Sequence, residues 1–205
     1  MNVSEPSDLV MSRTTSAVLR VLAGAKTAFS VREAARLSGV SPPRALEIVD
    51  HAAARGLVLV EQAGRSRMCR LNRDHLATDA IIALVTLRQR MLQALTEEIG
   101  SWEIAPIHAS LFGSAARGDG GTDSDLDVLV VRADVTPEDA WAEQTFTSGQ
   151  RLERLMGNAV SWFDISRSDL DRSVDRQEPV IVGWQADGIH LAGQQLRALL
   201  RRRTA

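Results

Sequence analysis

The sequence predicts an α+β protein of two domains, in which a helical N-terminal domain precedes an α/β domain with a small mixed sheet. Two observations lead to this expectation. Residues 12–75 hold three segments with apolar residues at helical spacing, followed by two short β-prone runs around a turn. Residues 76–205 combine helical patterns with apolar strand-like runs, as expected of a sheet covered by helices.

Capping and turn signals set the elements of the N-terminal domain. Ser30 and Glu33 have the spacing of a capping box, and Ser41 is an N-cap candidate followed by proline. Residues 1–11 show no pattern and are expected to form a loose tail. The expected elements are helices over 14–25, 30–38 and 42–56, and strands over 57–62 and 67–71.

This order of helix, helix, turn, helix and hairpin resembles a winged helix-turn-helix domain. In that family the third helix enters the major groove of double-stranded DNA, and the wing contacts the phosphate backbone. Residues 1–75 carry 11 basic and 7 acidic side chains, which favours a polyanionic partner. A winged domain that binds another protein is the alternative. The resemblance implies a DNA-binding face made of Ser41, Arg44, Glu47, His51, Arg65 and Arg67.

Residues 76–100 predict a long helix that links the two domains. Ile81, Val85, Leu92 and Leu95 recur at helical spacing, and this apolar stripe is expected to pack on the following sheet. It also offers a dimerisation surface. Because helix-turn-helix proteins commonly dimerise to read two half-sites, a homodimer is expected.

The loop between two predicted strands, 107–112 and 125–131, carries the chemistry of the C-terminal domain. The second strand opens with Asp125 and Asp127, which project to the same side because side chains alternate along a strand. Two carboxylates this close repel unless a cation lies between them, and Mg²⁺ prefers oxygen ligands of this kind.

The glycine-serine corner that ends the first strand supplies groups for a phosphate. Gly113 permits close backbone approach, while the Ser114 hydroxyl and the amides that follow can donate hydrogen bonds. Arg117 offers a guanidinium fork for phosphate oxygens. With the two carboxylates, these residues predict a site for Mg²⁺ and a nucleoside triphosphate. A hairpin with a merely solvated acidic loop is the alternative.

Three short motifs resemble the signature of the polymerase β-like nucleotidyltransferases, in their minimal branch: Gly113-Ser114, Arg117-Gly118 and Ser124-Asp125-x-Asp127. The resemblance implies that Asp125 and Asp127 hold Mg²⁺. It also implies nucleotide binding by Gly113, Ser114, Arg117 and Ser124. Catalytic members use two metal ions and a third carboxylate on the next strand.

The third predicted strand, 159–165, departs from that family pattern. Ser161 stands where the family places its third carboxylate. Asp164 follows three residues later, and strand alternation sends it to the opposite face unless a bulge intervenes. The candidate catalytic residues are Asp125, Asp127 and Asp164, with Asp164 or a group of the substrate completing the site.

Three further helical segments are expected in this domain. The helix over 137–156 is expected to bury Trp141, Phe146, Leu152 and Leu155. A short helix with a loop over 179–191 follows. A closing helix over 192–203 has arginines at its C-terminus, where cations offset the helix dipole.

Three functions remain open at the level of sequence. The protein could transfer a nucleoside monophosphate from an NTP to an acceptor hydroxyl, using two Mg²⁺ ions. It could instead bind the nucleotide without transfer and report its presence to the DNA-binding domain, as a transcription regulator. The domain could also serve assembly alone, for instance in a toxin-antitoxin pair. One fold hosts many functions, so the resemblance does not choose between them.

The composition indicates the class of protein and the cellular location to be expected. Of 205 residues, 44% are hydrophobic and 24% are charged, which is typical of a soluble globular protein. No apolar run approaches the roughly 18 residues of a membrane span, so no membrane association is expected. Cys69 is the single cysteine, which excludes an intramolecular disulfide and favours a cytoplasmic location.

Overall fold

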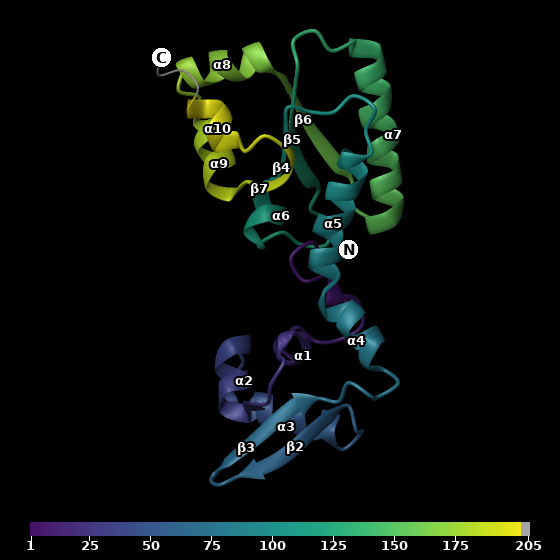
Figure 1. Ribbon diagram of the computed structural model, residues 1–205, viewed down its shortest axis with the longest axis vertical. Coiled ribbons are helices and arrows are strands. Elements are labelled where there is room, and N and C mark those ends of the chain that lie inside the picture. The colour runs from purple at the N-terminus through teal and green to yellow at the C-terminus, as the bar shows by residue number, and fades with distance from the viewer. Residues whose placement is uncertain (202–205) are drawn as a thin grey trace. The chain divides into compact units, whose positions relative to one another are not determined.

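The computed structural model describes residues 1–201, and it confirms the α+β class. The chain divides into two compact units (Figure 1). The N-terminal unit is Glu5–Arg88, and the C-terminal unit combines Met1–Ser4 with the chain from Gln89 onward. The described residues contain a three-stranded sheet in the first unit and a four-stranded sheet in the second.

The N-terminal unit has three helices followed by a hairpin, the order expected from the sequence (Figure 1). The Ser30 hydroxyl accepts a hydrogen bond from the Glu33 amide at 3.1 Å, so the predicted cap is confirmed. Ser41 makes no such side-chain bond, and Pro42 marks the helix start. The elements are η1 (Pro6–Leu9), α1 (Arg13–Gly24), β1 (Phe29–Ser30), α2 (Val31–Ser38), α3 (Pro42–Ala53), β2 (Val58–Ala63), β3 (Ser66–Leu71) and α4 (Thr78–Val85).

One apolar core fills the N-terminal unit. Both β1 and β2 pair antiparallel with β3, and this small sheet packs against the helices. Val18 and Leu22 from α1 meet Ile48 and Val49 from α3 and Cys69 from β3, all of them buried. The helices and the hairpin therefore share a single core.

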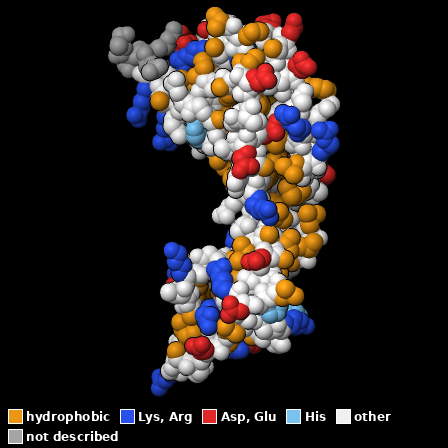
Figure 2. All heavy atoms as spheres, turned by 45° about the vertical axis from the view of Figure 1, so that its right-hand side comes forward, with side chains coloured by type: hydrophobic (Ala, Val, Ile, Leu, Met, Phe, Trp, Pro, Cys, Tyr) orange, Lys and Arg blue, Asp and Glu red, His pale blue; other side chains and the backbone are white. Residues whose placement is uncertain are grey.

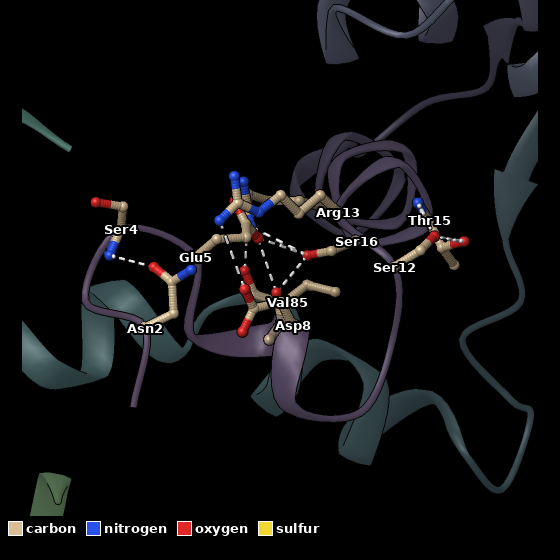
Figure 3. Close-up of polar contacts among 11 residues, drawn as sticks. Asn2, Ser4, Glu5, Asp8, Ser12, Arg13, Thr15, Ser16 and Val85 are labelled. Atoms are coloured by element: carbon tan, nitrogen blue, oxygen red, sulfur yellow. Dashed lines mark hydrogen bonds and ion pairs between the residues drawn. The ribbon is translucent and has the colours of Figure 1, made fainter. Parts of the chain in front are cut away.

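The first eleven residues do not form the loose tail that their composition predicted. Figure 3 shows the polar contacts around Glu5, between η1 and α1. The Glu5 carboxylate accepts hydrogen bonds from Ser7 at 2.8 Å, from Ser16 at 3.0 Å and from the Arg20 guanidinium. Arg20 Nε also donates to the Val85 carbonyl at 2.9 Å, which joins α1 to α4. Burial opposes the charge on Glu5, but these donors outweigh it and lower the pKa of Glu5.

The prediction of a single helix over 76–100 is wrong, because the helix is interrupted at Thr86, which separates α4 from α5. Thr86 ends α4 with φ −104° and ψ 10°, outside the helical region, and its hydroxyl donates to the Ile82 carbonyl at 2.7 Å. The remaining elements are α5 (Leu87–Gly100), β4 (His108–Phe112), α6 (Gly113–Arg117), β5 (Leu126–Arg132), α7 (Glu138–Met156), β6 (Val160–Ser166), α8 (Arg167–Asp175), α9 (Pro179–Asp187), β7 (Ile189–Gly193) and α10 (Leu196–Arg201).

The sheet of the C-terminal unit is mixed, as predicted, with strand order β6-β5-β4-β7. β4 pairs antiparallel with β5 and β7, whereas β5 and β6 run parallel. Its two faces are covered separately: Val128 and Val130 belong to the core that includes Trp141 of α7. Leu129 belongs to the other core, with Trp184 of α9. Figure 1 shows α7 on one side of the sheet and α8, α9 and α10 on the other.

Several expectations for this unit need correction. Phe146 and Leu155 are 66% and 69% exposed, because α7 turns Trp141 and Leu152 toward the sheet instead. Strand β7 was expected as loop and helix, and the closing helix begins only at Leu196. Residues 202 and 203 of the expected helix lie outside the described residues. No helix within residues 1–201 combines the length and apolarity needed to cross a bilayer.

Candidate nucleotide and metal site

A sharp corner between β4 and α6 brings the two sequence motifs together. Phe112, the last residue of β4, lies opposite Asp127 in the ladder with β5. Gly113 follows with φ +69°, a conformation that favours glycine. A Cβ atom added to Gly113 would lie 2.5 Å from Oδ2 of Asp127. There are therefore two reasons for glycine at this position: the backbone has a positive φ, and a side chain would collide with the Asp127 carboxylate.

Asp125 and Asp127 form a coupled acidic pair on the sheet face that carries Leu129. Burial raises the pKa of Asp127, and repulsion from Asp125 raises it further, while Arg117 opposes both effects. Asp125 is exposed and Asp127 is half-buried. Two carboxylates that repel each other are a suitable site for a divalent cation. Such a cation would neutralise their charge, and it takes carboxylate oxygens as ligands. Within residues 1–201 no third His, Cys, Asp or Glu side chain joins them as a potential ligand.

Strand β6 places a serine next to this pair. Ser161 lies opposite Asp127 in the parallel ladder, and its hydroxyl donates to Oδ2 of Asp125 at 3.3 Å. The register runs without a bulge, so Asp164 lies opposite Val130 and on the other face. There Asp164 forms an ion pair with Arg132 at 3.3 Å. The structure therefore does not bring Asp164 to the acidic pair.

The loop after the corner is held by its own backbone. The Ser114 carbonyl accepts hydrogen bonds from the backbone amides of Gly118, Asp119 and Gly120, at 3.0 to 3.2 Å. The Ser124 hydroxyl, predicted to bind the nucleotide, accepts from the Gly121 amide at 2.8 Å and so shapes the loop. The Ser114 hydroxyl makes no hydrogen bond to residues 1–201, which leaves it available to a ligand.

Two residues that the sequence did not single out fix the same loop. The side-chain amide of Asn158 donates to the carbonyls of Met1, Thr122 and Ser124, at 2.9, 3.1 and 3.0 Å. Val3 is fully buried and packs so closely that a Cβ on Gly120 would lie 2.5 Å from it. The one hint of this role in the sequence is the position of Asn158, directly after Gly157, the residue that ends α7.

Arg117 is positioned by carboxylates of its own chain. Its guanidinium donates to Asp187 of α9 at 3.0 Å and to Asp119 at 3.1 Å. Hydrogen bonds to Asp187 and then Asp119 raise the pKa of Arg117 above its ordinary value. Arg117 is exposed, so a phosphate that binds there has to compete with these two acids.

The predicted DNA-binding residues all belong to the N-terminal unit. Arg44 and Glu47 form an ion pair at 2.7 Å and, with His51, line a cleft of about 570 Å³ beside α3. Arg67 is half-buried and pairs with Asp50. Ser41 and Arg65 are exposed, at the start of α3 and in the β2–β3 turn. Figure 2 shows basic side chains dispersed among acidic ones on the visible face of the described residues.

Residues 92–171 match the family model described as a nucleotidyltransferase domain. The C-terminal unit has a nucleotidyltransferase-type fold. The matched residues include β4, β5 and β6. They therefore include the corner at Gly113, the acidic pair and Ser161. None of the curated proteins matches the chain.

Two solved structures illustrate what the chain is similar to. A MarR family transcriptional regulator from Silicibacter pomeroyi is 29% identical over 44% of this chain and 66% of that chain, with a TM-score of 0.34. The chain thus spans slightly less than two thirds of the regulator. A toxin-antitoxin structure with AMP-PNP is 21% identical over 53% of this chain and 79% of that chain, with a TM-score of 0.37.

Proposed function

We propose that this protein is a nucleotide-responsive DNA-binding regulator. In this proposal the C-terminal domain binds a nucleoside triphosphate with Mg²⁺, and the N-terminal winged helix-turn-helix domain binds double-stranded DNA. The observation that carries the proposal is the pairing of Asp127 with Ser161. It leaves two carboxylates at the place where transfer enzymes of this fold use three.

The roles of the site residues follow from their positions. Asp125 and Asp127 would hold Mg²⁺, whose charge would offset their repulsion and that of the phosphates. The Ser114 hydroxyl and the Arg117 guanidinium would bind phosphate oxygens. Gly113 keeps the backbone close enough for the Asp127 carboxylate to reach the corner. Ser124 supports the loop through the Gly121 amide.

Sensing is favoured over transfer because, among the residues that the structure describes, no third carboxylate joins the acidic pair to accept a proton from an attacking hydroxyl. A serine hydroxyl at position 161 is not a base near neutral pH, and Asp164 is bound to Arg132 on the other face. Such a site can still bind the metal-nucleotide complex, because the acidic pair and Arg117 remain. Nucleotide binding without turnover is what a sensor requires.

DNA binding is proposed from the N-terminal unit. The candidate residues are Ser41, which directly precedes α3, then Arg44, Glu47 and His51 on α3, Arg65 in the hairpin turn and Arg67 on β3. The excess of basic residues in this part of the chain favours a polyanion. In the proposal the DNA-binding form is a homodimer that reads two half-sites.

Three measurements on one preparation test the proposal. Calorimetry measures ATP binding in the presence of Mg²⁺, a coupled assay measures pyrophosphate release, and fluorescence anisotropy measures affinity for duplex DNA with and without ATP. We expect ATP binding, no pyrophosphate release, and a DNA affinity that changes when ATP is added. The variant with Asp125→Asn and Asp127→Asn should lose ATP binding and the change in DNA affinity together. Absence of ATP binding to the wild type would refute the proposal.

Nucleotidyl transfer is the second candidate, because the Asp125 and Asp127 pair that such transfer needs is kept. In that reaction an acceptor hydroxyl oxygen would bond to the α-phosphorus while the bond to the bridging oxygen breaks and pyrophosphate leaves. The hydroxyl proton would have to pass to a group of the acceptor. Release of pyrophosphate that depends on Mg²⁺ and on both aspartates would favour this candidate over sensing.

A further inference from the structure

An aromatic cluster lies beside the acidic pair, on the same face of the sheet. Phe163 of β6 contacts Phe112 and Trp184, with ring centroids 6.2 and 5.3 Å apart. Both contacts are of the edge type, with interplanar angles of 87° and 66°. Neither ring therefore lies parallel against Phe163. Trp184 is 1% exposed and Phe112 is half-buried, whereas Phe163 is 48% exposed, so Phe163 is the member of the cluster that is most open to solvent.

The ladder fixes where this exposed ring lies relative to the proposed metal site. Asp127 is flanked by Phe112 on β4 and by Ser161 on β6. Phe163 follows Ser161 by two residues on the same face, which corresponds to about 6.6 Å along the strand. An aromatic ring is thus held one step away from the carboxylate pair, within the span of one bound nucleotide.

We propose that Phe163 is the platform on which the base of the bound nucleotide stacks. This inference rests on the proposed nucleotide site and adds its base-binding part. A nucleobase is flat and weakly solvated on its faces, so an immobilised, half-exposed aromatic ring is the surface that suits it. Phe112 and Trp184 hold the ring of Phe163 in place, which reduces the entropy lost on binding.

The chemistry of the platform defines a class of ligand. Stacking uses the π face that every base possesses, so this contact does not select one base by hydrogen bonds. The site is therefore one for nucleoside triphosphates in general, with purines favoured over pyrimidines by their larger ring area. The triphosphate group itself is held elsewhere, by Ser114, Arg117 and the metal.

Comparing ATP with inorganic tripolyphosphate separates the base contact from the phosphate contacts. Both ligands are titrated calorimetrically into the full chain with Mg²⁺. Phe163→Ala should weaken ATP binding about 5- to 150-fold and leave tripolyphosphate binding unchanged. Phe163→Leu, which keeps an apolar cover on Trp184, should show the same selective loss, and Phe163→Tyr should stay close to wild type. Phe146→Ala is the matched control, because Phe146 is 66% exposed on α7 and should affect neither ligand.

The outcomes distinguish the platform from the site on which it depends. If the wild type binds tripolyphosphate but ATP no more tightly, the phosphate site stands and the platform is refuted. Equal weakening of both ligands by Phe163→Ala and Phe163→Leu would also refute it, since it would show a general disturbance of the sheet. If the wild type binds neither ligand, the nucleotide site and the platform fall together.

Discussion

Gly113 is the residue on which the geometry of the acidic pair depends most directly. We expect Gly113→Ala to cost about 2 to 4 kcal/mol of unfolding free energy. The methyl group would add the strain of a left-handed alanine to a clash with Asp127 Oδ2, 2.5 Å away. The displaced carboxylate should also weaken binding of Mg²⁺ and ATP. Urea unfolding and calorimetry measure the two effects.

Gly118 provides the control for that substitution. Its φ is +82°, but an added Cβ would meet nothing within 4 Å. Gly118→Ala should therefore cost only the backbone strain, about 1 to 2 kcal/mol, and leave nucleotide binding intact. If both alanine variants bind ATP as the wild type does, the contact between the corner and Asp127 does not position the carboxylate.

Ser161 marks the difference between a binding site and a transfer site. Ser161→Asp would place a carboxylate opposite Asp127, where it could help to hold a second cation and accept a proton. We expect this variant to raise Mg²⁺-dependent pyrophosphate release from ATP about 100-fold over the wild type. Without metal it should be less stable, because three acids then repel.

Ser161→Asn is the neutral counterpart of that change. It has nearly the same size as aspartate, so it should leave pyrophosphate release at the wild-type level. An equal rate in the aspartate and asparagine variants would show that a missing carboxylate is not what limits the site.

At the residue scale, sequence reasoning found the residues whose chemistry is visible in a short motif. Gly113, Ser114, Asp125 and Asp127 lie within fifteen positions of one another, and their spacing alone brought them together. Asn158 and Asp187 were missed, because their partners are distant in the chain. Asn158 reaches Met1 across 157 positions, and Asp187 reaches Arg117 across 70. Only the folded topology creates such contacts.

At the element scale, most helices and strands followed from caps, breakers and periodicity. The start of α2 at Ser30 is a local property of four residues and was predicted correctly. The face that α7 buries was predicted only in part, because Phe146 and Leu155 fit the periodicity but the sheet does not reach them. Strand β7 is short and lies at the sheet edge, and its assignment depends on pairing with β4.

The contact between η1 and α1 predicts a pH dependence for the N-terminal unit. The pKa of Glu5 is lower in the folded chain than its ordinary value of 4.5. The charged carboxylate therefore stabilises the fold above that value, and this stabilisation is lost as the pH falls through the lowered pKa. Glu5→Gln should destabilise the unit by about 1 to 3 kcal/mol at neutral pH.

Unfolding measurements on the wild type and on Glu5→Gln over a range of acidic pH test whether the lost stability comes from the charge of Glu5. The difference in unfolding free energy between wild type and Glu5→Gln should shrink as the pH falls below 4.5. Glu61→Gln, an exposed change on β2 of the same unit, should show no such difference at any pH. A difference that persists unchanged in acid would assign the effect to packing instead of charge.

At the scale of the whole molecule, each unit has a core of its own. The buried residues of α1, α3 and β3 form one cluster, and those of the four-stranded sheet form two others. We therefore expect two unfolding transitions in differential scanning calorimetry. ATP with Mg²⁺ at about 100 times its dissociation constant should stabilise the transition of the C-terminal unit by about 2.7 kcal/mol.

The double variant Asp125→Asn, Asp127→Asn identifies which transition responds. It should keep both transitions and lose the shift produced by ATP, because the metal ligands are gone while the cores are untouched. A single transition that shifts as a whole would instead mean that the two units unfold as one cooperative body.

Burial of Val3 against Gly120 has a practical consequence for anyone who purifies this protein. An affinity handle fused ahead of Met1 would emerge beside the Asn158 amide that holds the loop between α6 and β5, and it would change the ATP affinity being measured. Cleaving the handle off before titration avoids this artefact. Protein that keeps the handle and protein from which it has been cleaved should differ in ATP affinity more than in DNA affinity.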